Sequence, residues 1–402
     1  MARPRRPPFD SRLADFRDRA GLTQEQVAQE IGISAEMVRR HEQSISLPIA
    51  KYRERYSSLY NASEVELGLR IVVTRPPSSN QQSASSSVLL DIPSVWIPER
   101  IDATYLESVY KYIEQLIDLD NRFGGADLAR LAQRFFRTFR SQLSVETFKP
   151  VKSRDLFAAA GELSEVAGWL SYDADQQDAV RRLNQESLYF TRLAGDKKTE
   201  LLTLQNISMH AGFLNQPLEA LTIAESVLDG EYNLSPRMRA LFLARKARAL
   251  AQGGDESALR IFKEVQSLYL EGVQEADPAW TWWIDERELA WHEAMCQQAL
   301  GYSGEAIVQF ERSVEETPPA QVRGHYNNRA YLLNAQVDLK SWTAVERTMQ
   351  DLQPLVTEIA STRTVVYLRS VVGKLRMFET KVPTCIVELG EHLDRALDIA
   401  PI

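Results

Sequence analysis

The sequence is short of the residues that hold a fold together by covalent bonds or metal ions. Its 402 residues include two cysteines, Cys296 and Cys385, and five histidines scattered along the chain. A disulfide framework needs several paired cysteines, and a structural zinc site needs four clustered cysteine or histidine ligands. We therefore expect neither disulfides nor a metal site. Glycine and proline are also sparse, at 18 and 17 residues, which excludes collagen-like and low-complexity chains.

Long apolar runs are missing as well. No stretch approaches the roughly 18 uninterrupted apolar residues of a membrane span, and the N-terminus is basic without the apolar segment of a signal peptide. We therefore expect a cytoplasmic protein with no membrane partner. The composition, 44% hydrophobic and 25% charged, is that of a globular protein. At roughly 100 to 200 residues per domain, the length predicts about two to four domains.

Acidic residues exceed basic ones, but the excess is unevenly distributed. The formal net charge is −8 at pH 7, yet residues 1–70 contain 12 lysines and arginines against 10 acidic residues. The remaining residues contain 35 against 45. A slightly basic N-terminal part is compatible with phosphate binding, whereas the acidic remainder would repel nucleic acid.

Local composition divides the chain into five predicted segments. Residues 72–95 are rich in Pro, Ser and Gln without any period, which is typical of a linker. Beyond about residue 100, apolar residues recur at spacings of three and four, the pattern of amphipathic helices. We predict an all-α protein with a five-helix head. The segments are a basic arm (1–9), the head (10–70), a linker (71–99), a helical hairpin (100–154) and a repeat domain (155–402), of which the last two form the body.

A weak repeat runs through the repeat domain. A small residue followed by an aliphatic one occurs at Ala179-Val180, Ala220-Leu221, Ala258-Leu259, Ala306-Ile307, Ala344-Val345 and Cys385-Ile386. Several pairs follow a short polar turn, so each is predicted early in the second helix of a hairpin, where a small residue lets the helices approach closely. The pattern resembles tetratricopeptide repeats with longer helices, which implies an α-solenoid of stacked hairpins. An irregular helical bundle is the alternative.

The strongest local motif is GLTQEQVAQEIGISAEMVRRHE, residues 21–42. Thr23 and Ser34 are suited to cap two successive helices, and Gly32 can take the positive φ that a tight turn between them needs. The motif resembles the helix-turn-helix of the Cro and phage-repressor (XRE) class. That resemblance implies a recognition helix in the major groove of double-stranded DNA. His41 departs from the class, which usually has a bulky apolar residue there, and we expect it to be a packed or half-exposed core residue rather than a pH switch.

The resemblance also implies which side chains contact DNA. Gln24 would bind a phosphate, and Arg39 or Arg40 would hold a guanine, with Arg40 the first choice, unless both bind only phosphate. The predicted DNA-binding residues are Gln24, Ser34, Ala35, Glu36, Arg39, Arg40 and Gln43. Residues 3–8, RPRRPP, would form either an arm that contacts DNA or a solubilising tail.

The body contains no catalytic motif that we can identify, so we predict neither an enzyme nor a cofactor. It does contain two polar stripes at helical spacing, which would face a common groove on a concave solenoid or else simply be surface residues. An asparagine amide can both donate to and accept from a peptide unit. The predicted ligand-binding residues are Thr203, Asn206, His210, Arg245, Arg323, Asn327 and Asn334. Trp280, Trp282, Trp283 and Trp291 would either wall a pocket or pack in the core.

The combination of head and body resembles the intracellular peptide-pheromone receptors of Gram-positive bacteria. It also resembles the helix-turn-helix and tetratricopeptide regulators of actinobacteria, and residues 119–128, LDNRFGGADL, are similar to the latter. The resemblance implies a homodimeric transcriptional regulator whose repeats sense a small peptide, as in quorum sensing. Two alternatives stay open. The repeats would only dimerise the protein or dock another one, or the chain would be an enzyme with an accessory DNA-binding head.

Overall fold

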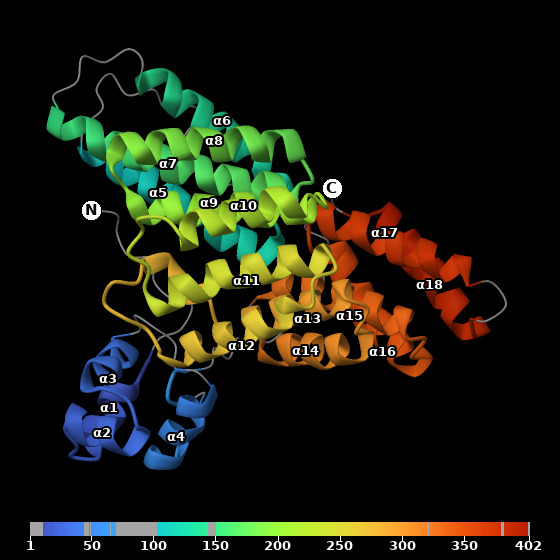
Figure 1. The fold of residues 1–402 in the computed structure, drawn as a ribbon, viewed down its shortest axis with the longest axis horizontal. Helices are drawn as coiled ribbons and strands as arrows, with labels where there is room; N and C mark the ends of the chain where they lie inside the picture. The colour runs from blue at the N-terminus through green and yellow to red at the C-terminus, as the bar shows by residue number, and fades with distance from the viewer. Residues whose placement is uncertain are drawn as a thin grey trace, which may run out of the picture.

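The computed structural model describes residues 11–43, 48, 50–64, 66–69, 103–143, 150–319, 321–378 and 382–400. Within these ranges the regular structure is entirely helical, with no strand (Figure 1). The all-α prediction is confirmed. The predicted basic arm (1–9) and linker (71–99) lie outside the described residues.

Four short helices make up the described part of the head. They are α1 (Leu13–Arg19), α2 (Gln24–Ile31), α3 (Ala35–Glu42) and α4 (Ala50–Tyr60). The hydroxyl of Thr23 accepts a hydrogen bond from the Gln26 backbone N–H, and that of Ser34 accepts one from Met37. Gly32, between α2 and α3, has a φ of 76°. Both predicted caps and the predicted glycine turn are confirmed, since each depends only on local backbone chemistry.

The head has its own small core. Leu13, Val27, Ile31, Val38 and Tyr56 are fully buried in it. Where a fifth helix is expected, the Leu67 N–H donates to the Ser63 carbonyl and the Leu69 N–H to the Glu64 carbonyl, a single turn that adds Leu67 and Leu69 to this core. Gly68, with a φ of 69°, ends that turn, because the left-handed conformation cannot continue a helix.

Fourteen longer helices in the described residues form the body. They are α5 (Ala103–Phe123), α6 (Ala126–Leu143), α7 (Pro150–Asp173), α8 (Gln177–Ala194), α9 (Lys197–Phe213), α10 (Pro217–Leu228), α11 (Pro236–Gln252), α12 (Ser257–Leu270), α13 (Glu286–Ala299), α14 (Ser303–Glu316), α15 (Val322–Asp338), α16 (Trp342–Glu358), α17 (Thr362–Met377) and α18 (Thr384–Asp398). A 3₁₀ turn, η1 (Ala279–Trp283), lies between α12 and α13. None of the helices described is both long enough and apolar enough to cross a membrane.

From α7 onward the helices pair into hairpins. The hairpin turns reuse one backbone device, a residue with positive φ, at Asp175, Asn215, Gly254, Gly301 and Lys340. Four or five residues after each of these turns comes a small residue of the sequence repeat. That small residue lies in the first turns of the second helix of the hairpin. The repeat therefore marks helix hairpins in the structure.

The small residues of the repeat pack as expected in the first four hairpins only. Ala179, Ala220, Ala258 and Ala306 are buried at the helix–helix contact. In the last two hairpins the aliphatic residue that follows, Val345 and Ile386, is buried instead, and Cys385 is exposed.

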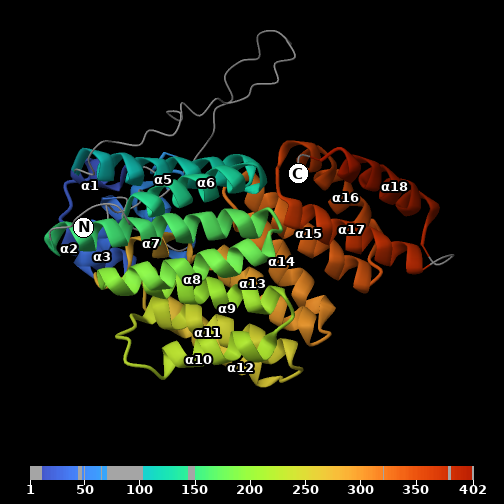
Figure 2. The same ribbon diagram turned by 90° about the horizontal axis from the view of Figure 1, so that it is seen from above.

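The stack of hairpins closes on itself. Helix α15 packs against α5, and α17 packs against α7, although each pair is far apart in sequence (Figure 2). The Ala360 N–H donates to the Phe123 carbonyl at 2.8 Å, and the Ala126 N–H donates to the Ala360 carbonyl at 3.0 Å. A side chain at Gly124, whose φ is 86°, would overlap Ala360. The open concave groove that we expected is thus replaced by a closed arrangement.

His41 supplies a pH dependence to the stability of the head. It is 2% exposed, its Nδ1 lies 3.1 Å from the Tyr56 hydroxyl, and burial together with Arg237 and Arg40 lowers its pKa from 6.5 to about 3. Between pH 6.5 and about pH 3, His41 is therefore protonated in the unfolded chain but neutral in the folded protein. The free energy of unfolding therefore falls as the pH drops through this window.

We expect His41→Phe to reduce this acid sensitivity. Chemical denaturation at pH 7 and pH 5 measures the loss of stability, and the variant should lose on the order of 2 kcal/mol less than the wild type. The exposed His392, replaced in the same way, is the control. An equal loss in wild type and His41→Phe would show that His41 is not held neutral by the fold.

Candidate functional site

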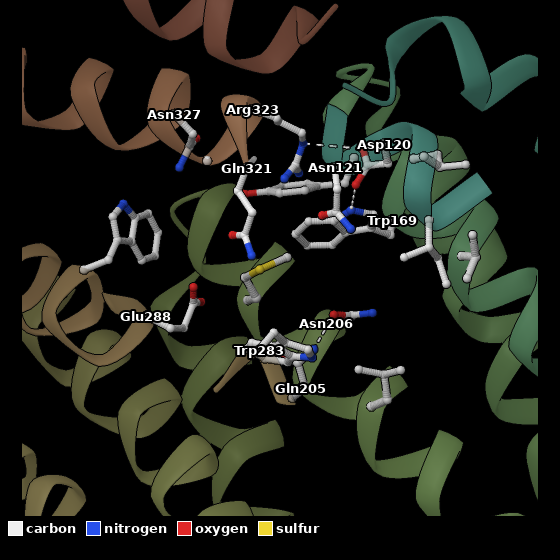
Figure 3. A pocket seen from close by; sticks show the side chains of 18 of the residues that line it. Asp120, Asn121, Trp169, Gln205, Asn206, Trp283, Glu288, Gln321, Arg323 and Asn327 are labelled. Carbon is white, nitrogen blue, oxygen red and sulfur yellow. Dashed lines mark hydrogen bonds and ion pairs between the residues drawn. The ribbon is translucent and has the colours of Figure 1, made fainter. Parts of the chain in front are cut away.

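A pocket of about 210 Å³ lies where the closed stack brings α5, α7, α9, α11, α13 and α15 together (Figure 3). Its walls combine tryptophans, arginines and amide side chains. Lining residues include Asp120, Asn121, Glu165, Trp169, Gln205, Asn206, Met209, Arg245, Trp282, Trp283, Arg287, Glu288, Trp291, Gln321, Arg323 and Asn327. The pocket is therefore built from residues that are far apart in the sequence, from Ile117 to Arg363.

Four of the seven predicted ligand-binding residues line this pocket: Asn206, Arg245, Arg323 and Asn327. The other three point elsewhere. The Thr203 hydroxyl lies 2.8 Å from that of Ser187, and the His210 Nε2 lies 2.7 Å from Gln177, so both face α8. Asn334 lies farther along α15, where Lys374 donates to its Oδ1 at 3.2 Å.

The error in the first stripe is a rotation of about one residue around α9. The residues of α9 that line the pocket are Leu202, Gln205, Asn206 and Met209, which are spaced three and four apart. Thr203 and His210 belong to the neighbouring face, which packs against the preceding helix. Asn206, expected outside the core, is 4% exposed, and its Nδ2 donates to Glu165 Oε1 at 2.9 Å.

Tryptophans form much of the pocket wall. Trp282, Trp283 and Trp291 line it, whereas Trp280 packs in the core and donates its indole N–H to the Lys198 carbonyl at 3.1 Å. The two predicted roles of this cluster are thus divided among its members. Trp169, from α7, completes the aromatic wall and was missed by the sequence interpretation. Among the described residues, the buried indole nitrogens of Trp282 and Trp291 have no hydrogen-bond partner, although a buried indole N–H normally has one.

Arg245 places a buried positive charge in the pocket wall. It is 3% exposed and donates to Gln205 Oε1 at 2.8 Å, and its Nη1 lies 2.8 Å from His292 Nε2. Burial lowers its pKa to about 10, while nearby Glu288 acts in the opposite direction. Within the described ranges, no carboxylate lies at ion-pair distance from this guanidinium. A buried cation held only by neutral partners can gain a charged hydrogen bond from a ligand carboxylate.

The same pocket contains an ionised carboxylate. Burial opposes ionisation of Glu288, but the hydrogen bond to His292 and the charges of Arg287 and Arg245 lower its pKa to about 2. His292 is neutral near pH 7, because burial and Arg245 lower its pKa to about 4. The pocket therefore has a cationic and an anionic wall position, which suits a ligand that carries both charges or a chain of peptide units.

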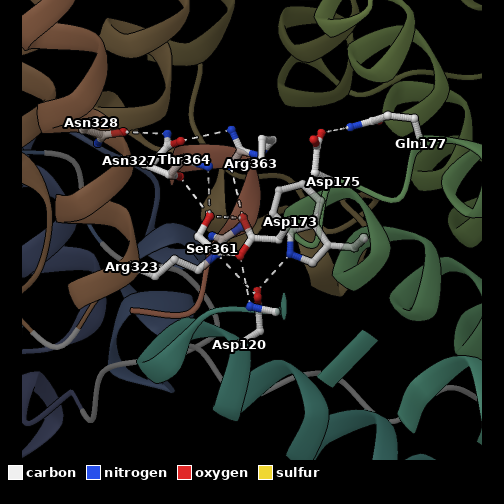
Figure 4. A network of polar contacts seen from close by, with 12 residues as sticks. Asp120, Asp173, Asp175, Gln177, Arg323, Asn327, Asn328, Ser361, Arg363 and Thr364 are labelled. Carbon is white, nitrogen blue, oxygen red and sulfur yellow. Dashed lines mark hydrogen bonds and ion pairs between the residues drawn. The ribbon is translucent and has the colours of Figure 1, made fainter. Parts of the chain in front are cut away.

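A buried ionic network closes one side of the pocket (Figure 4). Asp173, at the end of α7, is fully buried, with Arg323 Nε and Arg363 Nη2 each 3.3 Å from its carboxylate. It also accepts hydrogen bonds from the Ser361 hydroxyl at 2.8 Å and the Gly125 N–H at 3.0 Å. Every oxygen of this carboxylate is thus paired with a donor from another part of the chain.

A second carboxylate shares Arg323. Asp120 Oδ1 lies 3.4 Å from Arg323 Nε, and its Oδ2 accepts a hydrogen bond from the Trp169 indole at 2.9 Å. Burial raises the pKa of Asp120, with Arg323 opposing. Burial alone would also raise the pKa of Asp173, but the two arginines outweigh it and lower that pKa. Asp173 is therefore the ionised anchor of the network.

The predicted DNA-binding residues of the head are only partly exposed. Ser34 and Gln43 are exposed, Ala35 and Arg39 are half-buried, and the side chain of Glu36 lies outside the described part of the chain. Arg39 Nη1 donates to Gln43 Oε1 at 2.8 Å, which aligns both on one side of α3.

Gln24 and Arg40 differ from the expectation. The Gln24 amide donates to Glu42 Oε2 at 2.7 Å, and Glu42 also accepts from Arg17 Nε at 2.6 Å, so this group ties α1, α2 and α3 together. Arg40, expected on the outward face, is 8% exposed. Its burial makes Arg39 the more accessible arginine of α3.

In the described residues, no group of His, Cys, Asp and Glu side chains is arranged to hold a metal ion. No protein-family model matches the chain, and no curated protein matches it.

The Asp173 network predicts a large effect of a single substitution. Asp173→Ala should lower the free energy of unfolding by about 3 to 5 kcal/mol, because it leaves Arg323 and Arg363 buried without their shared carboxylate. Denaturant unfolding measures this. Asp178→Ala, at an exposed position of α8, should change stability by less than about 0.5 kcal/mol. A similar small effect of both substitutions would mean that the network does not hold the ends of the stack together.

Proposed function

We propose that this protein is a sequence-specific DNA-binding transcriptional regulator of the XRE type, with a tetratricopeptide-like body that senses a small ligand. The observation that supports DNA binding best is the pair α2 and α3. Two capped helices are joined at Gly32 in the left-handed conformation, and α1 and α4 pack behind them around a common core. This is the arrangement in which a second helix can enter a major groove.

Helix α3 would carry the sequence readout. Arg39 and Gln43 share its accessible side, and Ser34 lies at its N-terminus, where backbone N–H groups favour a phosphate. Arg39 is the more accessible arginine of α3 in this structure, so we assign the guanine contact to it first, and Arg40 is the alternative when α3 is free of the body. Gln24 would have to exchange Glu42 for a phosphate in order to play its proposed role.

The pocket supports ligand sensing rather than a purely architectural body. Arg245 and the buried indole N–H groups of Trp282 and Trp291 offer donors, and Glu288 offers an acceptor. A small peptide, or another compact ligand with a carboxylate, fits this set of partners. Arg245 would hold the carboxylate, and the tryptophans would pack against the apolar part.

The body would also hold two copies together on DNA. A single recognition helix reads one half-site, so a regulator of this type gains affinity and specificity as a dimer. Helices α17 and α18 offer a surface for self-association, because several of their large apolar side chains are exposed. Exposed apolar side chains there are Val366, Met377, Val387 and Ile399.

The DNA proposal is tested by selecting binding sites from random sequences with the full chain and then measuring affinities by fluorescence anisotropy. Arg39→Ala should weaken binding to the selected site by roughly 1 to 3 kcal/mol and relax the choice at one base pair. Arg260→Ala removes the same charge from an exposed position of the body and should have little effect. Failure of every form of the chain, wild type and variants, to select a sequence would refute DNA recognition, whereas an unchanged motif with Arg39→Ala would refute only the residue assignment.

The sensing proposal is tested with cell extract and spent medium, fractionated by their effect on DNA binding. Arg245→Met should abolish the response to the active fraction, because the carboxylate loses its partner, while the chain stays folded. Lys246→Met is the matched control, since Lys246 is adjacent on α11 and pairs with Glu225 at 2.7 Å outside the pocket. Binding of the active fraction is also measured by calorimetry. The same heat of binding with wild type and Arg245→Met would show that Arg245 does not bind the ligand.

A further inference from the structure

The head is docked on the body, and α3 is part of the contact. Met37 of α3 is 8% exposed, and its Cε packs directly over Gly272, which follows α12. A Cβ at Gly272 would overlap this methyl group. The φ of Gly272 is 84°, so glycine serves here both for its backbone conformation and for the close approach.

Helix α4 makes the second part of the contact. Arg53 Nη2 lies 2.9 Å from Glu316 Oε2 at the end of α14, and the two side chains are only 10% and 25% exposed. The neighbouring Tyr52 packs against the apolar core of the body as well as against that of the head. The contact thus combines an ion pair with apolar packing.

The centre of the docking surface is a buried arginine of the body. Arg237 is 4% exposed and stacks on Tyr269 with its Cζ 5.2 Å from the ring centroid. Its charge is close enough to His41 of α3 to contribute to the lowered pKa of that histidine. Arg237, Tyr269, Gly272 and Glu316 therefore define a docking surface for α3 and α4.

This docking conflicts with insertion of α3 into DNA. A helix with its side chains is about 10 to 12 Å wide, and the major groove is about 12 Å wide, so groove walls lie on both flanks of an inserted helix. Met37 lies on a flank of α3 that would face such a wall, three residues from Arg40 and on the same side. In this structure the body occupies that flank.

We infer that the docked arrangement is an autoinhibited state, in which the body blocks the recognition helix, and that the head must leave the docking surface to bind DNA. The inference rests on the proposed DNA-binding function. Contacts of Gly272 and Glu316 with the head hold this state.

The pocket is physically connected to the docking surface. The segment between α12 and α13 begins beside Met37 at Gly272 and continues through η1 to Trp282 and Trp283, which line the pocket. A ligand that displaces these tryptophans therefore acts on the same segment that contacts α3. The ligand can change DNA affinity only as far as its own affinity differs between the docked and the released position of the head.

Two variants of the body test the inference without altering the head. Glu316→Arg replaces the ion pair with Arg53 by repulsion. Gly272→Asn keeps a residue that tolerates positive φ but overlaps Met37. In the full chain, each should raise affinity for the selected DNA site by about fivefold or more, as expected for the loss of one modest contact. Hydrogen exchange of the α3 amides should increase in parallel, which reports release of the head.

Each variant has a matched control. Glu315→Arg makes the same charge change at the exposed neighbouring position, and Gly301→Asn makes the same substitution at a φ of 86° with open space around it. Both should leave DNA affinity and α3 exchange unchanged. Wild-type affinity in both Glu316→Arg and Gly272→Asn overturns the inference, whether or not exchange increases. If no form of the chain binds a selected sequence, the DNA-binding proposal fails instead, and α3 exchange alone still tests whether these contacts hold the head.

Discussion

The architecture of the body depends on the burial of one carboxylate. Asp173 is removed from water at the end of α7, where an isolated charge would cost several kcal/mol. Arg323 and Arg363, which come from the other end of the stack, offset that cost only if α15 and α17 approach α7 and α5. These ion pairs can therefore form only when the two ends of the stack are in contact. The stack satisfies this condition by closing on itself.

Closure explains why the body has a pocket and not an open groove. In an open stack, the inner face of α9 and that of α15 would be solvated surfaces too far apart to share a small ligand. When the two ends of the stack meet, Asn206 and Asn327 line the same pocket, and the side chains between them become buried. Arg245 is then buried next to Gln205 and His292, with the ionised Glu288 nearby. Under the proposed function, this charge would bind the carboxylate of the ligand.

The features that could be predicted from the sequence are those determined within a few residues. Caps at Thr23 and Ser34, the turn at Gly32 and the hairpin positions follow from local backbone chemistry and helical periodicity. The stripe on α9 was wrong by one position because Thr203 and Asn206 differ by less than a quarter turn, and only packing decides which faces inward. The burial of Arg40 and the pairing of Asp173 with Arg363 depend on contacts between distant segments, for which a single sequence contains no signal.

The head and the pocket place opposite demands on the segment between α12 and α13. Packing of Met37 over Gly272 needs a close, fixed approach, whereas in the proposed sensor the wall built from Trp282 and Trp283 would have to accommodate a ligand. The segment, residues 271–285, is long, but the Asp277 carboxylate braces it by accepting hydrogen bonds from the Ser235 hydroxyl and from the Gln274 N–H, and η1 follows directly. In the proposed sensor, a ligand that moves Trp282 and Trp283 would therefore act on Gly272 through a braced segment. This coupling requires no change in the stacked hairpins themselves.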